Sequence, residues 1–324
     1  MTQNSQIVGN YEFLGIVERP KAGVTYKVRN LVTGEFEVLR MLPGASYDDP
    51  EARERLLREI RIHTRLSHPN IVAFHDALEL DGHLVMTAQF VEGGNLAELC
   101  LPGPMPSVVA IRAIAAVLAG LEEAHALGIV HRGITAEHVV ITRGGEAMLG
   151  GFGLAKPASD VNLTVAGAVV GDARYISPEQ VVGDSLDARA DLYSVGILLF
   201  QALTGKVPFS ASNDFDIMMA QVSRQPPRPS ALNPGVAPEL EQIVLRALAK
   251  KPGDRFPNAR DFRLALEAVQ RPVAMTAPLE APPNTATPRL LPPLQAQKRP
   301  RAAFVFGALG LVIALGIVAL LVFH

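Results

Sequence analysis

The stretch between residues 130 and 153 constrains the fold of this chain most strongly. Residues 130–138 form a mixed run with several polar side chains, which is typical of a loop. Residues 139–141 (Val-Val-Ile) are β-branched and favour a strand, and Arg-Gly-Gly at 143–145 is a turn signal. A return strand begins at 148–149 (Met-Leu) and ends in glycines. We therefore predict a polar loop that leads into a tight β-hairpin.

Three motifs in and after this stretch resemble the catalytic core of the eukaryotic-type Ser/Thr protein kinases, a family with bacterial members. His131 and Arg132 stand at the start of the family's H-R-D motif, and Gly-Phe-Gly at 151–153 stands at D-F-G. Ser-Pro-Glu at 177–179 stands at A-P-E. The resemblance covers roughly residues 8–270. It implies an α+β, two-lobed protein-kinase-like fold, with a small β-rich N-lobe and a larger helical C-lobe.

We expect four parts along the chain: a kinase-like N-lobe over residues 8–92, a kinase-like C-lobe over 93–270, a Pro-rich disordered linker over 271–301 and a transmembrane helix over 302–323. The linker carries 8 prolines in 31 residues, a composition that cannot build a core. The last segment has 22 residues without a charge. As a helix it would extend about 33 Å, enough for a bilayer core of about 30 Å.

The charges near that segment predict where the domain lies. Lys-Arg-Pro-Arg at 298–301 directly precedes the uncharged run, and basic residues favour the cytoplasmic side of a membrane. We therefore expect a single-pass protein of the cell membrane with a cytoplasmic kinase-like domain. The net charge of −2 gives no reason to expect a nucleic-acid partner. The expected partners are the membrane and another protein, such as an active kinase or its substrate.

The resemblance also places a nucleotide cleft between the lobes. The family's glycine-rich loop keeps only its outer glycines here, and Pro20 removes a backbone donor between them. Arg40 stands at the position of the strand lysine, and we expect it to pair with Glu59 on the following helix. Val38 replaces the alanine above the adenine and narrows that slot. The positions equivalent to the cleft are Gly15, Gly23, Val38, Arg40, Glu59, Gln89 and Val91.

Four residues depart from the groups that phosphoryl transfer needs in this family. Gly133 stands at the position of the base, and Thr135 stands at that of the loop lysine. His138 and Gly151 stand at the positions of the two metal ligands. With Arg40 these make five departures in one site. We therefore expect no intact catalytic group and no metal site. ATP stays a possible ligand, whereas Mg²⁺ is not expected to bind.

The residues that hold the fold together match the family. The resemblance implies that Asp191 binds the backbone of the turn formed by His131 and Arg132. It also implies an ion pair between Glu179 and Arg255, which as a buried pair is costly to break.

This contrast favours a membrane-anchored pseudokinase that acts as a cytoplasmic signalling scaffold or regulator. Two alternatives stay open. One is an active Ser/Thr protein kinase in which Glu137, Glu146 or His138 takes over metal binding. The other is a metal-independent nucleotide sensor that binds ATP and changes shape without turnover.

Overall fold

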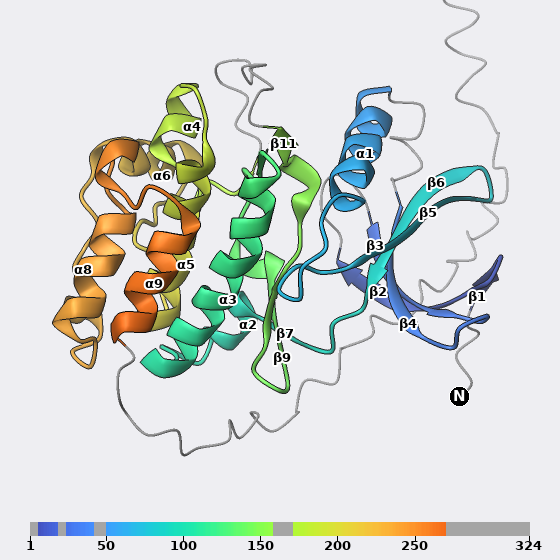
Figure 1. Cartoon of the computed structure of the whole chain (residues 1–324), viewed down its shortest axis with the longest axis horizontal. Helices are drawn as coiled ribbons and strands as arrows, with labels where there is room; N and C mark the ends of the chain where they lie inside the picture. Colours follow the sequence, from blue (N-terminus) through green and yellow to red (C-terminus); the bar gives the residue numbers. More distant parts are fainter. Residues whose placement is uncertain (1–5, 19–23, 42–49, 158–170, 270–324) are drawn as a thin grey trace, which may run out of the picture. The chain divides into compact units, whose positions relative to one another are not determined.

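The computed structural model describes residues 6–18, 24–41, 50–157 and 171–269. Within this part the large sheet gathers at one end and most helices gather at the other, which gives two lobes (Figure 1). The two-lobed α+β arrangement predicted from the sequence is confirmed.

The N-lobe is an antiparallel six-stranded sheet in the order β1-β2-β3-β4-β6-β5. Its strands are β1 Gln6–Val8, β2 Tyr11–Glu18, β3 Val24–Asn30, β4 Phe36–Met41, β5 Phe74–Leu80 and β6 His83–Gln89. Because side chains alternate along a strand, one face of β3 and β4 buries Val28 and Leu39 in a small apolar core. Helix α1 (Pro50–His63) contacts the sheet where Leu56 meets Met86.

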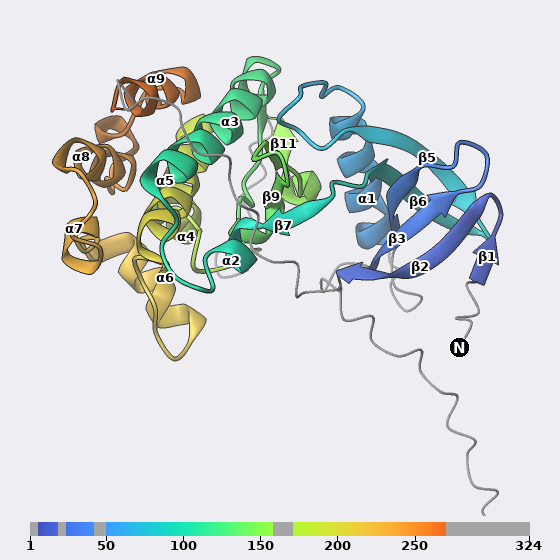
Figure 2. The same ribbon diagram turned by 90° about the horizontal axis from the view of Figure 1, so that it is seen from below.

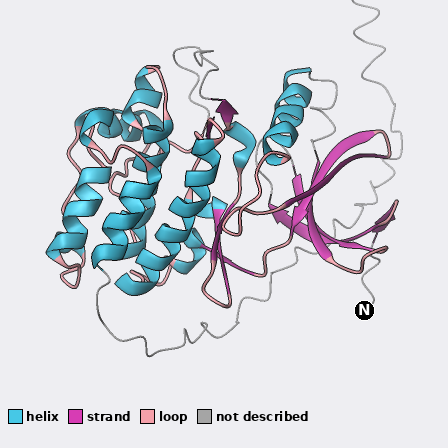
Figure 3. Ribbon diagram, in the orientation of Figure 1, coloured by secondary structure: helices cyan, strands magenta, loops and turns pink. Residues whose placement is uncertain are grey.

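The C-lobe is helical and organised around α5 (Ala188–Thr204), which is buried along almost its whole length. Apolar residues occur on every side of α5, so neighbouring helices rather than solvent must cover it. Helix α3 (Ser107–Ala126) packs against α5 and α9, and α8 packs against α5 (Figure 3). The other helices are α2 Leu96–Leu99, α4 Pro178–Val182, α6 Asp214–Ser223, α7 Pro229–Leu232, α8 Pro238–Ala247 and α9 Ala259–Val269.

Short strands between the lobes carry the central stretch of the sequence. Strands β9 (Val139–Thr142) and β10 (Ala147–Leu149) pair antiparallel, so the predicted hairpin is confirmed. β7 (Gly93–Asn95) pairs with β9, and β8 (Ile129–Val130) pairs with β11 (Lys156–Pro157). Both views place β7 and β9 between the large sheet and the helices (Figure 2).

Two short 3₁₀ turns flank this hairpin and carry most of the predicted site. The turn η2 (Ala136–His138) precedes β9, and η3 (Phe152–Leu154) follows β10. A third turn, η4 (Pro252–Asp254), lies before α9. The loop of residues 131–138, which ends in η2, is called the His131 loop below.

The predicted transmembrane helix requires a correction. Within the ranges given above, no helix is both long and apolar enough to cross a bilayer. The segments 271–301 and 302–323 lie outside the described residues. The fold class is therefore corrected to the two-lobed kinase-like fold alone, and the cell-membrane location stays a prediction.

Candidate functional site

Asp191, in the first turn of α5, fixes the start of the His131 loop. Its two carboxylate oxygens accept hydrogen bonds from the backbone N–H groups of His131 and Arg132, each at 2.8 Å. Burial by itself raises the pKa of Asp191, but the hydrogen bond and charge of His125 hold it below the usual carboxyl range. Arg132 has a φ of +64°, which is strained for a residue other than glycine. Asp191 therefore stabilises a turn that the backbone alone does not favour, as the resemblance implies.

The buried ring of His131 joins this loop to the residues after β10. Its Nδ1 accepts a hydrogen bond from the backbone N–H of Gly133 at 3.3 Å. The ring proton therefore lies on Nε2, which donates to the carbonyl oxygen of Gly150 at 2.9 Å. Burial lowers the pKa of His131 to about 4, so the imidazole is neutral at pH 7.

A column of aromatic rings continues from His131 into the N-lobe. Phe152 lies 4.4 Å from His131 between ring centroids, and His63 lies 5.4 Å from Phe152. Phe74 of β5 stacks on His63 at 6.3 Å. Burial lowers the pKa of His63 to about 4, so this ring also packs as a neutral group. The sequence shows His63 only as one residue of the apolar face of α1, and its place in this column depends on the tertiary fold.

His138 and Gly151, the two positions of the lost metal ligands, lie against each other. The Nδ1 of His138 donates to the carbonyl oxygen of Gly133 at 2.7 Å, which fixes the ring. Gly151 has a φ of +78°, and a Cβ built on it would lie 2.3 Å from Cδ2 and 2.6 Å from Nε2 of His138. The imidazole therefore fills the space that an aspartate at position 151 would need. Reading the sequence one position at a time misses this contact.

Gly133 and Thr135 lie on the same loop, beside η3. A Cβ on Gly133 would lie 2.9 Å from Cδ1 of Leu154, the movable end of that side chain. Leu154 therefore covers the place where the family has its base, but it leaves room for a side chain if it shifts. Thr135 is only 8% exposed.

Arg40 and Glu59 form the ion pair that the sequence predicts. The Nη1 of Arg40 donates to Oε1 of Glu59 at 2.5 Å, and the Glu59 side chain is 5% exposed. This contact joins β4 to α1. A Cβ on Gly153 would lie 3.2 Å from both Arg40 Nη1 and Glu59 Oε2, so the ion pair also lies against η3.

The other predicted cleft residues are placed by the large sheet. Val38 of β4 stands directly opposite Ala88 of β6, and residues paired in this way lie on the same face of a sheet. The side chain of Val38, which is larger than the family's alanine, therefore lies beside the small side chain of Ala88. Gln89 is the last residue of β6 and Val91 follows two residues later. Gly15 lies within β2, whereas Gly23 lies outside the described residues.

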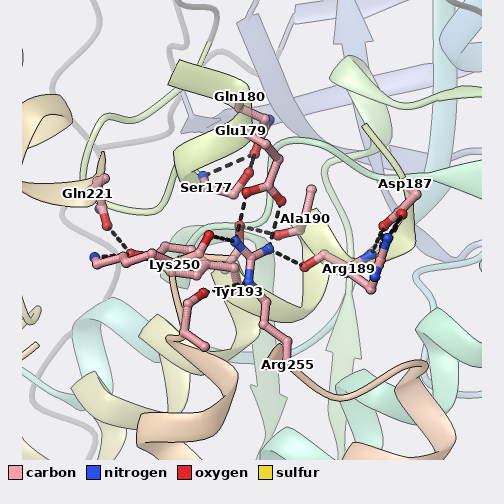
Figure 4. A network of polar contacts seen from close by, with 12 residues as sticks. Ser177, Glu179, Gln180, Asp187, Arg189, Ala190, Tyr193, Gln221, Lys250 and Arg255 are labelled. Carbon is pink, nitrogen blue, oxygen red and sulfur yellow. Dashed lines mark hydrogen bonds and ion pairs between the residues drawn. The ribbon is translucent and has the colours of Figure 1, made fainter. Parts of the chain in front are cut away.

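Arg255 and Glu179 form the predicted buried ion pair in the C-lobe (Figure 4). Nη1 donates to Oε1 at 2.6 Å and Nη2 donates to Oε2 at 2.7 Å. The three remaining N–H groups of Arg255 donate to the carbonyl oxygens of Ala249, Arg189 and Lys250. All five donors of the guanidinium are thus used, which is the condition for a buried ion pair to stabilise a fold.

The side chains around Gly151 do not fit a magnesium ion. Mg²⁺ prefers oxygen ligands in an octahedral arrangement, whereas Gly151 has no side chain and His138 offers only nitrogen. Glu137 lies 3.5 Å from Nη2 of Arg174, and Glu146 is exposed beside the hairpin turn. In the described ranges, no group of three or more His, Cys, Asp or Glu side chains is placed to hold a metal ion.

Comparison with known proteins identifies the family. Residues 11–272 match the protein kinase domain. The chain is 32% identical to the Serine/threonine-protein kinase PknH of Mycobacterium tuberculosis over 296 residues, which covers 88% of this chain and 47% of that protein. It is 34% identical to the Serine/threonine-protein kinase PknL of the same species over 253 residues, covering 78% of this chain and 63% of PknL. The aligned parts are thus about half to two thirds of these relatives' length.

A solved structure agrees with this result. The crystal structure of the Mycobacterium tuberculosis PknI kinase domain superposes with a TM-score of 0.64 at 27% sequence identity. The match covers 83% of this chain and 99% of that one. The chain therefore belongs to the protein kinase family.

Proposed function

We propose that this protein is a pseudokinase: a kinase domain that binds another protein as a regulator or scaffold and does not transfer phosphate. One observation carries the proposal. The ring of His138 fills the space beside Gly151, where the family's metal-binding aspartate would stand. The site therefore lacks both metal ligands, and a single substitution at Gly151 has no room to restore one.

The size of the expected defect supports the same conclusion. A missing general base lowers a rate by roughly 10²–10⁴. A missing metal ion removes several kcal/mol of stabilisation of the negative charge on the transferred phosphate. Gly133 and Gly151 carry no side-chain atom that takes over either role. The two effects act on the same step, so together they lower the rate of phosphate transfer by several orders of magnitude.

The intact framework supports a binding role. The Arg40–Glu59 pair joins β4 to α1 within the N-lobe, and the Arg255–Glu179 pair joins two segments of the C-lobe. The ring column connects α1 to Phe152 and His131. Protein kinases act on protein substrates, so a protein partner suits the surface of this fold. An active kinase with substituted ligands is less well supported, because Glu137 is engaged by Arg174 and Glu146 is exposed at a turn.

Phosphate transfer from labelled ATP tests the proposal directly. The full chain is incubated with ATP and either Mg²⁺ or Mn²⁺, with a general protein acceptor, and both acceptor and self-labelling are measured. We expect no incorporation above that of the matched variant Arg40→Ala. Metal-dependent incorporation that Arg40→Ala abolishes would show an active kinase and refute the proposal.

A nucleotide sensor is the second candidate, favoured by one pair of residues. Ala88 stands opposite Val38, so the larger residue above the adenine slot has a small neighbour. Arg40 also keeps a positive charge at the position of the phosphate-binding lysine. Binding of ATP without a metal requirement, measured by thermal denaturation, would favour this function over a scaffold that binds no nucleotide.

A further inference from the structure

Lys250, between α8 and η4, holds its amine among neutral groups (Figure 4). Its Nζ donates hydrogen bonds to the hydroxyl oxygen of Tyr193 at 3.1 Å and to the carbonyl oxygen of Ala220 at 3.5 Å. The same atom lies 4.4 Å from the ring centroid of Phe209 and 5.5 Å from that of Tyr193. Within the described ranges, no carboxylate forms an ion pair with this amine.

The charge of Arg255 further disfavours the protonated form of this amine. Nη2 of Arg255 donates to the backbone carbonyl oxygen of Lys250 at 3.0 Å, so the guanidinium lies beside the same residue while it pairs with Glu179. Burial and the charge of Arg255 lower the pKa of Lys250 to about 8. Burial also raises the pKa of Tyr193, so its hydroxyl stays a neutral partner at pH 7. A lysine that is removed from water and placed near another cation has a nucleophilic amine.

The amine keeps a lone pair, and its side chain is only half-buried. Lys250 retains partial exposure to solvent, whereas Tyr193 and Phe209 are enclosed by the C-lobe. A neutral amine has two N–H groups, and the hydrogen bonds to Tyr193 and Ala220 use both. The lone pair is therefore left for an electrophile that approaches from the exposed side.

We propose that Lys250 is a site at which a small acyl phosphate acylates this protein. The amine nitrogen attacks the carbonyl carbon of the acyl phosphate and forms an N–C bond. The bond between that carbon and the bridging oxygen breaks, and phosphate leaves with the electron pair. The proton lost by the nitrogen passes to solvent, and the product is a neutral amide. This site goes beyond the proposed function, because it does not depend on whether the domain transfers phosphate.

The surroundings of Lys250 favour this class of donor over larger ones. A half-buried amine is reached more easily by a compact acyl group than by a bulky one. Arg255 and the exposed Lys251 carry positive charge on either side of the donor's approach in the sequence, which attracts an anionic phosphate.

A chain of hydrogen bonds connects Lys250 to the segment before α4. Tyr193 donates through its hydroxyl to Oε1 of Gln221 at 2.7 Å. Nε2 of Gln221 donates to the carbonyl oxygens of Ala173 at 3.2 Å and Arg174 at 2.9 Å. The amide formed by acylation keeps one N–H, so it gives up one of the two hydrogen bonds that the amine makes. Acylation therefore loosens the hold of this chain on residues 173–174.

Site-resolved acetylation with acetyl phosphate tests the proposal in the full chain. The folded chain is treated at a pH of about 8 and digested with chymotrypsin, and fragment masses give the rate at each lysine. Lys251 is the internal control, since it is exposed and next in the sequence. At this pH about half of Lys250 is neutral, against less than about 1% of an ordinary lysine. Because a less basic amine is also a weaker nucleophile, as for thiols, we expect acetylation at Lys250 to be at least about fivefold faster.

Two conditions separate the effect of the fold from that of the local sequence. In guanidinium chloride the unfolded chain should be acetylated at Lys250 and Lys251 at equal rates. In the folded chain the rate at Lys250 should level off above a pH of about 8, where its amine is already neutral. The rate at Lys251 should keep rising, about tenfold per pH unit, because an ordinary lysine has a pKa of about 10.4.

Hydrogen exchange of the backbone at residues 173–175 measures the consequence of the modification. Lys250→Gln has a neutral side chain, as the acylated lysine does, and should speed exchange in this segment. The acetylated chain should behave in the same way. Lys251→Gln makes the same change at the exposed neighbour and should leave the exchange unaltered. Thermal denaturation of both variants verifies that they are folded.

The outcomes separate this inference from the proposed function. Equal rates at Lys250 and Lys251 in the folded chain overturn the site, and so does a preference for Lys250 that persists in the unfolded chain. Unchanged hydrogen exchange in both the acetylated chain and Lys250→Gln overturns the connection to residues 173–174. These measurements use no ATP, so their failure leaves the proposed function standing.

Discussion

The contact between His138 and Gly151 makes a quantitative prediction about stability. Gly151→Ala adds a single Cβ at a position where φ is +78° and where His138 Cδ2 lies 2.3 Å away. The change therefore introduces backbone strain and a steric clash at once. His138→Ala removes the clash and leaves the strain, so the two variants and their combination form a double-mutant cycle.

The expected magnitudes follow from these two contributions. A residue with a Cβ in the left-handed region costs roughly 1–2 kcal/mol. Overpacking of a filled site costs typically about 1–3 kcal/mol more. We expect Gly151→Ala to lower the free energy of unfolding by about 2–5 kcal/mol in the original chain. In the His138→Ala background the same change should cost only about 1–2 kcal/mol, because the ring is gone.

Urea unfolding followed by circular dichroism measures all four proteins of this cycle. The coupling energy, which is the difference between the two effects of Gly151→Ala, should be about 1–3 kcal/mol. Its sign should make the double variant more stable than the sum of the two single effects predicts. Unchanged slopes with denaturant would show that the variants differ in stability rather than in the unfolded state. Additive effects within about 0.5 kcal/mol would mean that the ring does not occupy this space, and the reasoning would be refuted.

Two further predictions concern the framework of the fold. Arg255→Ala should lower the free energy of unfolding by about 3–5 kcal/mol, because Glu179 is left buried and unpaired. The control Arg263→Ala breaks ion pairs with Glu122 and Glu267, which are partly exposed. In the same urea assay this control should lower the free energy of unfolding by at most about 1 kcal/mol. The pKa of about 4 for His63 and His131 lies below the unfolded value of about 6.5, so the unfolded chain binds more protons between these values. The free energy of unfolding should therefore fall as the pH drops from about 6.5 to about 4, by up to about 1.4 kcal/mol per pH unit for each histidine. His63→Leu should make this pH dependence less steep. An unchanged pH dependence in His63→Leu would contradict the lowered pKa of His63.

Some long-range contacts of this fold were predictable from the sequence. Arg40 with Glu59, and Glu179 with Arg255, are pairs of opposite charge at positions that the family resemblance links, although 19 and 76 residues separate them. The hairpin of β9 and β10 was predictable because β-branched residues and a glycine turn specify it locally.

Other features depend on tertiary placement and leave no local signal. His138 and Gly151 are separate departures in the sequence, and only the folded loop brings the ring against the glycine. From the sequence alone, Val38 is predicted to narrow the adenine slot. The residues around Val38 in the sequence do not show that strand pairing places the small Ala88 opposite it. The transmembrane helix predicted from the uncharged run at 302–323 has no counterpart among the helices of the described ranges.

Nucleotide binding with and without a divalent metal tests the central claim most directly. The full chain is denatured thermally in the presence of ATP alone, ATP with Mg²⁺, and Mg²⁺ alone. Because His138 fills the place of one metal ligand and Gly151 lacks the other, we expect Mg²⁺ to add no stabilisation to whatever ATP provides. A rise in the denaturation temperature that requires both ATP and Mg²⁺ would reveal a working metal site and contradict the account.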